Sequence, residues 1–227
     1  MIRDCDSNAE NVKPRFNNDN IKELYDARFL RLYDLQYKEG AHYYDVSRRA
    51  SENLVARKSD EEFRNMLPDA VTIAVVVEAA GEEPRLLLNY EYRYPVGQYL
   101  LSPIAGLIDK EDSKEEDPLT AAAKREIFEE SGLRVKDTDR IEVVNPCAFS
   151  SPGMTDESNA FLYVHIKVQD LSELSQEGAE GSELFNGYEL VNKEEALRLF
   201  ASGRDKYGNF FSIATWVVLA VFISSAS

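Results

Sequence analysis

The strongest constraint on the fold is the segment 71–77, an unbroken run that is rich in β-branched residues and reads VTIAVVV. A run without polar alternation is typical of a strand that is buried on both of its faces. Strand-like and helix-like segments interleave along the rest of the chain, and no internal repeat is visible. We therefore predict an α/β or α+β fold that contains this buried strand.

Local signals predict the other elements. The clearest helix covers 118–131, because Asp117 can cap it, Pro118 suits its first turn and Gly132 follows its end. The remaining predicted strands cover 85–88, 141–144 and 161–168, and the remaining predicted helices cover 192–201 and 211–223. The last helix contains the longest apolar run of the chain, which is too short to span a bilayer and predicts a buried terminal helix.

The N-terminal part of the chain has a different character. Residues 1–20 are polar and carry little hydrophobic periodicity, so we expect a flexible leader there. Two β-rich runs, 29–37 and 42–46, surround a glycine-containing turn and predict a β-hairpin. We therefore expect a β-rich N-terminal region over 21–66 and the main domain over 67–227.

The charge of the chain restricts its partners. It has 26 Lys and Arg residues against 41 Asp and Glu residues, and its formal net charge is −15. Such acidity argues against binding of nucleic acid or of an anionic membrane, which depends on clustered basic side chains. The only cysteines, Cys5 and Cys147, exclude a disulfide scaffold and suit a reducing compartment. No secretory signal is visible, and we expect a cytoplasmic protein.

Three carboxylates on the predicted helix 118–131 stand at positions that are electrostatically unfavourable for a helix. Glu126, Glu129 and Glu130 stand at positions i, i+3 and i+4, so they share one face. Like charges at this spacing cost about 0.2–0.5 kcal/mol per pair. Acids in the last turn of a helix cost roughly another 0.3–1 kcal/mol. Hard cations such as Mg²⁺ or Mn²⁺ would resolve this conflict, since they take carboxylate oxygens and substrate phosphates together. The alternative is an ordinary solvated helix face.

The sequence around these glutamates favours a metal site over a solvated helix face. The segment 125–133, R-E-I-F-E-E-S-G-L, resembles the second half of the Nudix box, G-x5-E-x7-R-E-U-x-E-E-x-G-U with U aliphatic. The first half departs from the pattern, because eighteen residues separate Gly106 from Arg125 where the box has thirteen. Counting back from Arg125 places the first glutamate of the box on Asp117, with Glu116 one residue away.

The resemblance implies a fold and a chemistry. The Nudix fold is a mixed β-sheet sandwiched between helices, and its members hydrolyse nucleoside diphosphates linked to another moiety with the help of Mg²⁺ or Mn²⁺. By resemblance, Glu126 and Glu130 would be the main metal ligands and Glu129 would ligate or hold water. The carbonyl of Ala105 would complete the ligand set, and Arg125 would orient a carboxylate of the helix.

Two further segments resemble the ADP-ribose pyrophosphatase branch of that family. The segment 91–97, E-Y-R-Y-P-V-G, precedes A-G-L-I-D and implies that Arg93 reaches a substrate phosphate. The segment 151–157, S-P-G-M-T-D-E, resembles a loop whose carboxylate acts as general base or binds metal, and Glu157 is the matching residue. The alternatives are an ordinary arginine at a strand end and an exposed acidic turn.

The N-terminal hairpin resembles the extra β-region that makes dimers in this branch. There the family places an aromatic residue for base stacking and an arginine for the substrate, which correspond here to Tyr44 and Arg49. Arg48 competes with Arg49 for that role, and Tyr44 could instead belong to the core of the hairpin. The resemblance therefore implies a homodimer.

Together these features predict a Mg²⁺-dependent hydrolase of ADP-ribose or a related nucleoside diphosphate sugar, which releases AMP and a sugar phosphate. Other substrates within the family are NADH, dinucleoside polyphosphates and other nucleotide sugars, because the box says little about the second moiety. A Nudix-fold module that binds a nucleotide without cleaving it is the alternative from another functional class.

Overall fold

The computed structural model describes residues 13–176 and 184–225, so most of the expected leader lies outside the described residues. The chain forms two compact units, which we describe separately. One comprises the N-terminal residues up to Leu67 together with Phe149–Glu157, and the other comprises Pro68–Ala148 and the residues from Ser158 onward. The chain therefore passes between the units three times, after Leu67, after Ala148 and after Glu157.

The larger unit contains a seven-stranded mixed sheet in the order β10-β5-β4-β9-β8, with β6 paired to β5 and β7 paired to β4. The strand β4 pairs parallel with β9, whereas it pairs antiparallel with β5 and β7. The strands are β4 (Ala70–Ala79), β5 (Arg85–Arg93), β6 (Gln98–Ser102), β7 (Ile104–Leu107), β8 (Arg140–Phe149), β9 (Ser158–Val168) and β10 (Phe185–Val191).

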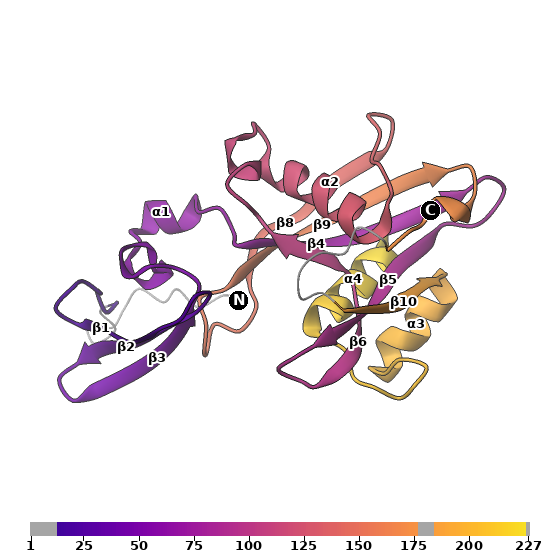
Figure 1. The fold of residues 1–227 in the computed structure, drawn as a ribbon. Helices are drawn as coiled ribbons and strands as arrows, with labels where there is room; N and C mark the ends of the chain where they lie inside the picture. The colour runs from indigo at the N-terminus through magenta and orange to yellow at the C-terminus, as the bar shows by residue number, and fades with distance from the viewer. Residues whose placement is uncertain (1–12, 177–183, 226–227) are drawn as a thin grey trace, which may run out of the picture. The chain divides into compact units, whose positions relative to one another are not determined.

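Helices cover both faces of this sheet, as Figure 1 shows. The helix α2 (Pro118–Ser131) packs on one face, and α3 (Lys193–Ser202) and α4 (Ile213–Ser224) pack on the other. Side chains of β4 alternate between the two resulting cores: Val71, Ile73, Val75 and Val77 lie on the α2 side, and Ala74 and Val76 on the α3 and α4 side. The unbroken apolar run is explained by this double burial, and the predicted fold class is confirmed.

The terminal helix α4 is buried on one side only. Val218, Leu219 and Phe222 are buried, whereas Ile213 at its start is 70% exposed. Trp216 is partly exposed and stacks on Phe200 of α3, with ring centroids 4.3 Å apart. No helix in the described part of the chain is both long enough and apolar enough to cross a membrane.

The N-terminal unit is built on a three-stranded antiparallel sheet of β1 (Ile21–Asp26), β2 (Arg31–Lys38) and β3 (Ala41–Ser47). The predicted hairpin corresponds to β2 and β3, and β1 is an additional strand. A small core of Tyr33, Leu35 and Leu54 supports the sheet. The turns η1 (Ser51–Asn53) and η2 (Val55–Arg57) and the helix α1 (Asp60–Arg64) follow, and Ser59 and Glu62 form a capping box at the start of α1.

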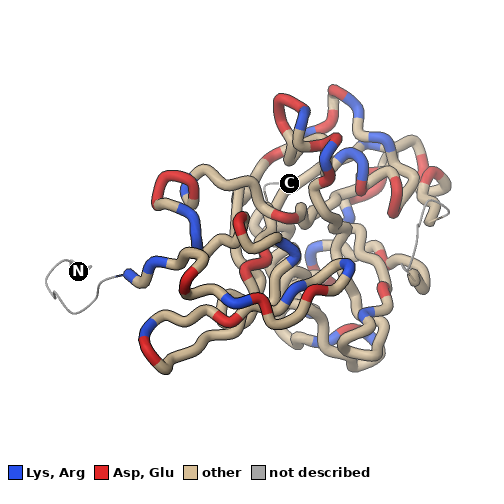
Figure 2. Tube along the Cα trace, turned by 60° about the vertical axis from the view of Figure 1, so that its left-hand side comes forward, with Lys and Arg blue, Asp and Glu red and all other residues tan. Residues whose placement is uncertain are grey.

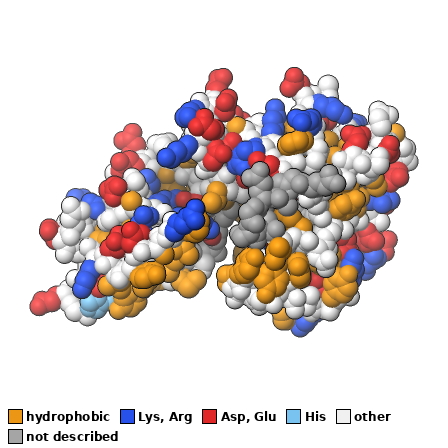
Figure 3. All heavy atoms as spheres, viewed as in Figure 1, with side chains coloured by type: hydrophobic (Ala, Val, Ile, Leu, Met, Phe, Trp, Pro, Cys, Tyr) orange, Lys and Arg blue, Asp and Glu red, His pale blue; other side chains and the backbone are white. Residues whose placement is uncertain are grey.

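Charged and apolar side chains are distributed differently over the surface. Lys and Arg residues are interspersed with Asp and Glu residues along the described trace in Figure 2. Large apolar side chains gather over both units in Figure 3. The exposed apolar residues of β1, β3 and the turn after β1 are Leu24, Tyr25, Phe29, Leu30, Tyr43 and Tyr44.

Asp45 of β3 is a buried acid in the N-terminal unit. Burial, together with the nearby charge of Asp156, raises the pKa of Asp45 from 3.8 to about 6, although the backbone of Asp156 and the charge of Arg49 work in the opposite direction. A raised pKa means that the folded protein holds a proton on Asp45 at pH values where the unfolded chain has released it. The free energy of unfolding therefore falls as the pH rises from about 4 to about 6.

This linkage predicts the effect of replacing Asp45→Asn, which removes the charge without changing the size of the side chain. The substitution should stabilise the protein above pH 6 by up to about 3 kcal/mol and have little effect near pH 4. Urea unfolding of both proteins between pH 4 and pH 8 measures this difference. Asp19→Asn, at an exposed position of the same unit, is the control; an equal change in both variants would contradict the prediction.

Candidate active site

Arg125 is the centre of the acidic cluster on α2. Its Nη1 donates to Glu126 Oε1 at 2.7 Å and to Glu129 Oε2 at 2.9 Å. Its Nη2 donates to Asp112 Oδ2 and to the carbonyl oxygen of Leu107, both at 2.8 Å. One guanidinium therefore ties two carboxylates of the helix to the loop before the helix and to the end of β7.

The electrostatics of this arrangement keep the guanidinium charged. Desolvation works against the charge of Arg125, but the hydrogen bond with Asp112 and the charge of Glu126 outweigh it and raise the pKa of Arg125. Charge-assisted hydrogen bonds of this kind are roughly twice as strong as neutral ones. The repulsion expected among the helix glutamates is thus offset by a cation of the protein itself.

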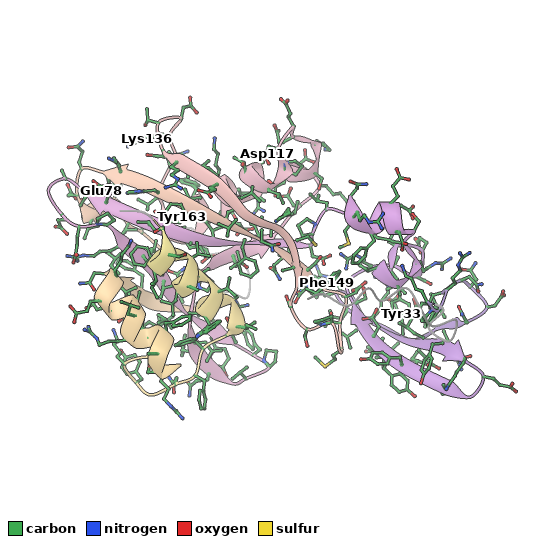
Figure 4. All side chains as sticks on the ribbon, turned by 180° about the vertical axis from the view of Figure 1, so that it is seen from behind. Tyr33, Glu78, Asp117, Lys136, Phe149 and Tyr163 are labelled. Carbon is green, nitrogen blue, oxygen red and sulfur yellow. The ribbon has the colours of Figure 1, made fainter. Side chains whose placement is uncertain are left out.

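The structure changes the interpretation of the first acidic position of the box. Asp117 caps α2: its Oδ1 accepts a hydrogen bond from the backbone N–H of Thr120 at 3.2 Å, and it lies at the start of the helix in Figure 4. The loop acid within hydrogen-bond distance of Arg125 is the buried Asp112, in the short turn η3 (Asp112–Lys114), whereas Asp109 lies farther off, at 3.7 Å from Arg125 Nε. Counted forward from Gly106, five residues intervene before Asp112, as in the box. The five extra residues therefore lie after this acid, and forward counting would have found it.

Gly106 of β7 forms the seat of the Glu126 carboxylate. A Cβ atom added at this position would overlap all three atoms of that carboxylate. Only glycine leaves room there, because any other residue would force the buried Glu126 side chain away. The glycine of the box is thus explained by close approach of a carboxylate, and not by a positive φ angle.

Glu130 is the second buried carboxylate of the helix. Its Oε2 accepts a hydrogen bond from Asn89 Nδ2 at 2.6 Å, and its Oε1 accepts one from the backbone N–H of Ala105 at 3.2 Å. Asn89 lies in β5, is itself buried, and accepts a hydrogen bond from Gln176 Nε2 at 3.2 Å. Sequence analysis did not identify Asn89; the signal was a single amide inside the apolar run of the strand, which needs a buried partner.

The donor chemistry of these residues fits a hard divalent cation. Glu126, Glu129 and Glu130 supply carboxylate oxygens from one helix, and the backbone of Ala105 lies against Glu130. Oxygen ligands of this type are those that Mg²⁺ and Mn²⁺ prefer. Within the described residues, no three His, Cys, Asp or Glu side chains are gathered closely enough to hold an ion by themselves. The carboxylates are held instead by Arg125, Asn89 and the backbone.

The predicted substrate arginine Arg93 lies at the end of β5. Its Nη2 contacts Glu91 Oε2 at 2.6 Å, and its side chain is about half exposed. The same strand thus carries Asn89, which contacts Glu130, and Arg93 four residues further on. A role of Arg93 in phosphate binding stays a prediction.

The other predicted residues belong to the N-terminal unit. Glu157 accepts a hydrogen bond from Arg48 Nε at 3.3 Å. Arg49 forms an ion pair with Asp156, at 3.1 Å between Nη1 and Oδ1, and both side chains are nearly buried. Tyr44 is 55% exposed, so it does not belong to the core of the hairpin, where Tyr33 takes that place. Substrate roles for Tyr44 and Arg49 stay predictions.

The position of Asp112 gives a test of its structural role. Asp112→Ala should lower the free energy of unfolding by about 1.5–3 kcal/mol, because it removes a hydrogen bond between charged groups and leaves Arg125 partly unpaired. Glu111→Ala is the control, since Glu111 pairs with Lys114 on the exposed side of the same loop and such pairs contribute about 0–1 kcal/mol. Equal losses in denaturant unfolding of the two variants would contradict this assignment.

Known proteins resemble this chain over much of its length. A family model of the NUDIX domain matches residues 66–211. An uncharacterized Nudix hydrolase of Schizosaccharomyces pombe is 33% identical over 104 residues, which are 46% of this chain and 44% of the relative. The match thus spans less than half of either protein.

Solved structures also resemble it. The crystal structure of an ADP compounds hydrolase aligns with a TM-score of 0.53 at 16% identity, covering 90% of this chain and 91% of the other. An Ap4A hydrolase from C. elegans aligns with a TM-score of 0.44 at 16% identity, covering 67% of this chain and 94% of the other. The former supports the fold described above, and the match to the family model extends over most of the chain. The chain belongs to the Nudix family.

Proposed function

We propose that the protein hydrolyses the diphosphate bond of ADP-ribose or of a related nucleoside diphosphate sugar, in a reaction that requires Mg²⁺ and yields AMP and a sugar phosphate. The observation that carries this proposal is the pair of buried carboxylates on α2, Glu126 and Glu130, each seated against the backbone of β7. Burying a carboxylate costs free energy of folding unless it is paired, hydrogen-bonded or bound to a metal ion. Family membership and the fold shared with an ADP compounds hydrolase support the same reaction.

In this reaction the bound metal would neutralise the diphosphate and activate water. Glu126 and Glu130, with Glu129 and the Ala105 carbonyl, would hold that metal. Arg125 orients the carboxylates of Glu126 and Glu129 through the hydrogen bonds that its Nη1 donates to both. Asn89 fixes the second oxygen of Glu130 in the same way.

The remaining predicted residues would act on the substrate itself. Glu157 would accept the proton of the attacking water, Arg93 would bind a phosphate, and Tyr44 and Arg49 would contact the nucleoside part. The exposure of Tyr44 supports a stacking role, since an exposed ring has a free face. Arg49 is already engaged by Asp156, and the half-exposed Arg48 is the alternative.

We also propose a cytoplasmic homodimer that binds neither nucleic acid nor membranes. The exposed apolar side chains of the N-terminal unit support self-association, because such patches mark interaction surfaces (Figure 3). The net charge of −15 and the interspersed charges of Figure 2 support the exclusion of polyanionic partners.

The experiment that tests the function is incubation of the purified protein with Mg²⁺ and a panel containing ADP-ribose, other ADP-sugars, NADH and a dinucleoside polyphosphate. Chromatography should show AMP appearing fastest from ADP-ribose. Faster cleavage of another compound would replace the substrate and keep the chemistry. If nothing is cleaved while ADP-ribose raises the melting temperature, the protein is a binding module and the proposal is wrong.

Replacing Glu130→Gln gives a second test. The amide keeps the size of the side chain but loses the charge that would hold the metal, so we expect kcat to fall at least about 100-fold while the fold persists. Glu115→Gln, at an exposed position before α2, is the matched control and should keep its turnover. Turnover of the Glu130→Gln variant near that of the unchanged protein would contradict the assignment.

A further inference from the structure

The loop that carries Glu157 is part of the N-terminal unit, although it lies between β8 and β9 in the sequence. The backbone N–H of Val46 in β3 donates to the carbonyl oxygen of Met154 at 3.0 Å, and Val46 and Thr155 form a parallel β-bridge. The hydroxyl of Tyr43 donates to the carbonyl oxygen of Gly153 at 2.8 Å. Residues of β3 thus bind the backbone of the loop, through the main chain of Val46 and the side chain of Tyr43.

A nearly buried ion pair strengthens this attachment. Arg49 Nη1 donates to the carbonyl oxygen of Asp156 at 3.0 Å and contacts the carboxylate of the same residue at 3.1 Å. Asp156 Oδ2 also accepts a hydrogen bond from the backbone N–H of Val55 at 3.2 Å. The two side chains are only 13% and 10% exposed, so water screens this pair little.

Arg48 makes the contact that reaches the carboxylate itself. Its Nε lies 3.3 Å from Glu157 Oε1, and the side chains are 42% and 35% exposed. The backbone carbonyl of Arg48 accepts a hydrogen bond from Arg31 Nη1 at 3.3 Å, so the position of Arg48 is tied to β2. An exposed pair of this kind contributes about 0–1 kcal/mol to stability. What the contact does provide is a cation placed directly against one oxygen of the Glu157 carboxylate.

The main chain next to Glu157 is also held on its other side. Ser158, the first residue of β9, is fully buried in the larger unit. Its backbone N–H and its hydroxyl both donate to Asp69 Oδ2, at 2.9 and 3.0 Å. The two residues that flank Glu157 in the sequence, Asp156 and Ser158, are therefore both held in place. The main chain at Glu157 is fixed by them, and the direction of its side chain depends on other contacts.

We propose that the N-terminal unit positions the general base of the reaction: Arg49 fastens the loop through Asp156, and Arg48 orients the carboxylate of Glu157. The inference rests on the proposed function, in which Glu157 accepts a proton from water. This gives Arg48 and Arg49 a positioning role, in place of the substrate contact considered for them above. General-base catalysis depends on placement within hydrogen-bond reach, and misplacement by about 1 Å can cost up to about 100-fold in rate.

A double-mutant cycle tests the role of Arg48. Glu157→Gln should lower kcat by about 100-fold or more, and Arg48→Gln should lower it by about tenfold with little change in KM. If Arg48 acts through Glu157, adding Arg48→Gln to Glu157→Gln should have no further effect. Arg48→Lys should recover part of the loss, because it keeps the charge. Arg64→Gln, at an exposed arginine in the last turn of α1 in the same unit, is the control.

The outcomes separate this inference from the proposed function. A double variant that is slower than Glu157→Gln by the full factor of Arg48→Gln would overturn the inference alone. Normal turnover of the Glu157→Gln variant would overturn both the assigned base and the inference. Absence of turnover in the unchanged protein on every panel substrate would overturn the proposed function.

Hydrogen exchange tests the attachment of the loop without relying on activity. Arg49→Gln should speed the exchange of the backbone amides of 151–157, while the amides of β4 in the larger unit keep their protection. Unchanged exchange in the loop would show that Arg49 does not fasten it, and would overturn that half of the inference. Faster exchange throughout the protein would point to general unfolding and would likewise count against a local clamp.

Discussion

The site depends on the interaction of one arginine with a set of carboxylates. Arg125 contacts Glu126, Glu129 and Asp112 and also the backbone of Leu107. Without this cation, acids at i, i+3 and i+4 in the last turns of a helix would repel one another and the helix dipole. The guanidinium holds Glu126, which is buried, and Glu129 by hydrogen bonds. The other buried acid, Glu130, is held by Asn89 and by the backbone N–H of Ala105. An acidic protein can in this way keep a site that a metal and an anionic substrate would share.

Elements with a strong local signal were predictable from the sequence. The unbroken run of β4 follows from burial on both faces, and the ends of α2 follow from Asp117 and from Gly132, which has φ +73° at the helix end. The strands β1, β6, β7 and β10 were missed. The strands β6 and β7 are short, and only Pro103 separates them. In β10, Gly187 has a φ angle of +83° and disturbs the regular strand pattern. Such strands are specified by their neighbours more than by their own residues.

The same distinction applies to the site. The three glutamates of α2 follow from helical spacing, because contacts within one helix are local. Asn89 does not, since its partner Glu130 lies 41 residues away along the chain. Asp112 could have been found by counting forward from Gly106, although its contact with Arg125 is visible only in the structure. The pairs of Arg48 with Glu157 and of Arg49 with Asp156 are of this kind too, as they join positions more than a hundred residues apart. Long-range pairs of this type depend on the tertiary fold, which a single sequence does not display.

The proposed function requires that the carboxylates of α2 bind a divalent cation. Titration of the protein with Mn²⁺, followed by the electron paramagnetic resonance signal of the free ion, tests it without any substrate. We expect saturable binding to the unchanged protein, binding at least about tenfold weaker after Glu130→Gln, and unchanged binding after Glu115→Gln. Equal Mn²⁺ affinity in all three proteins, or no binding to any of them, would contradict it.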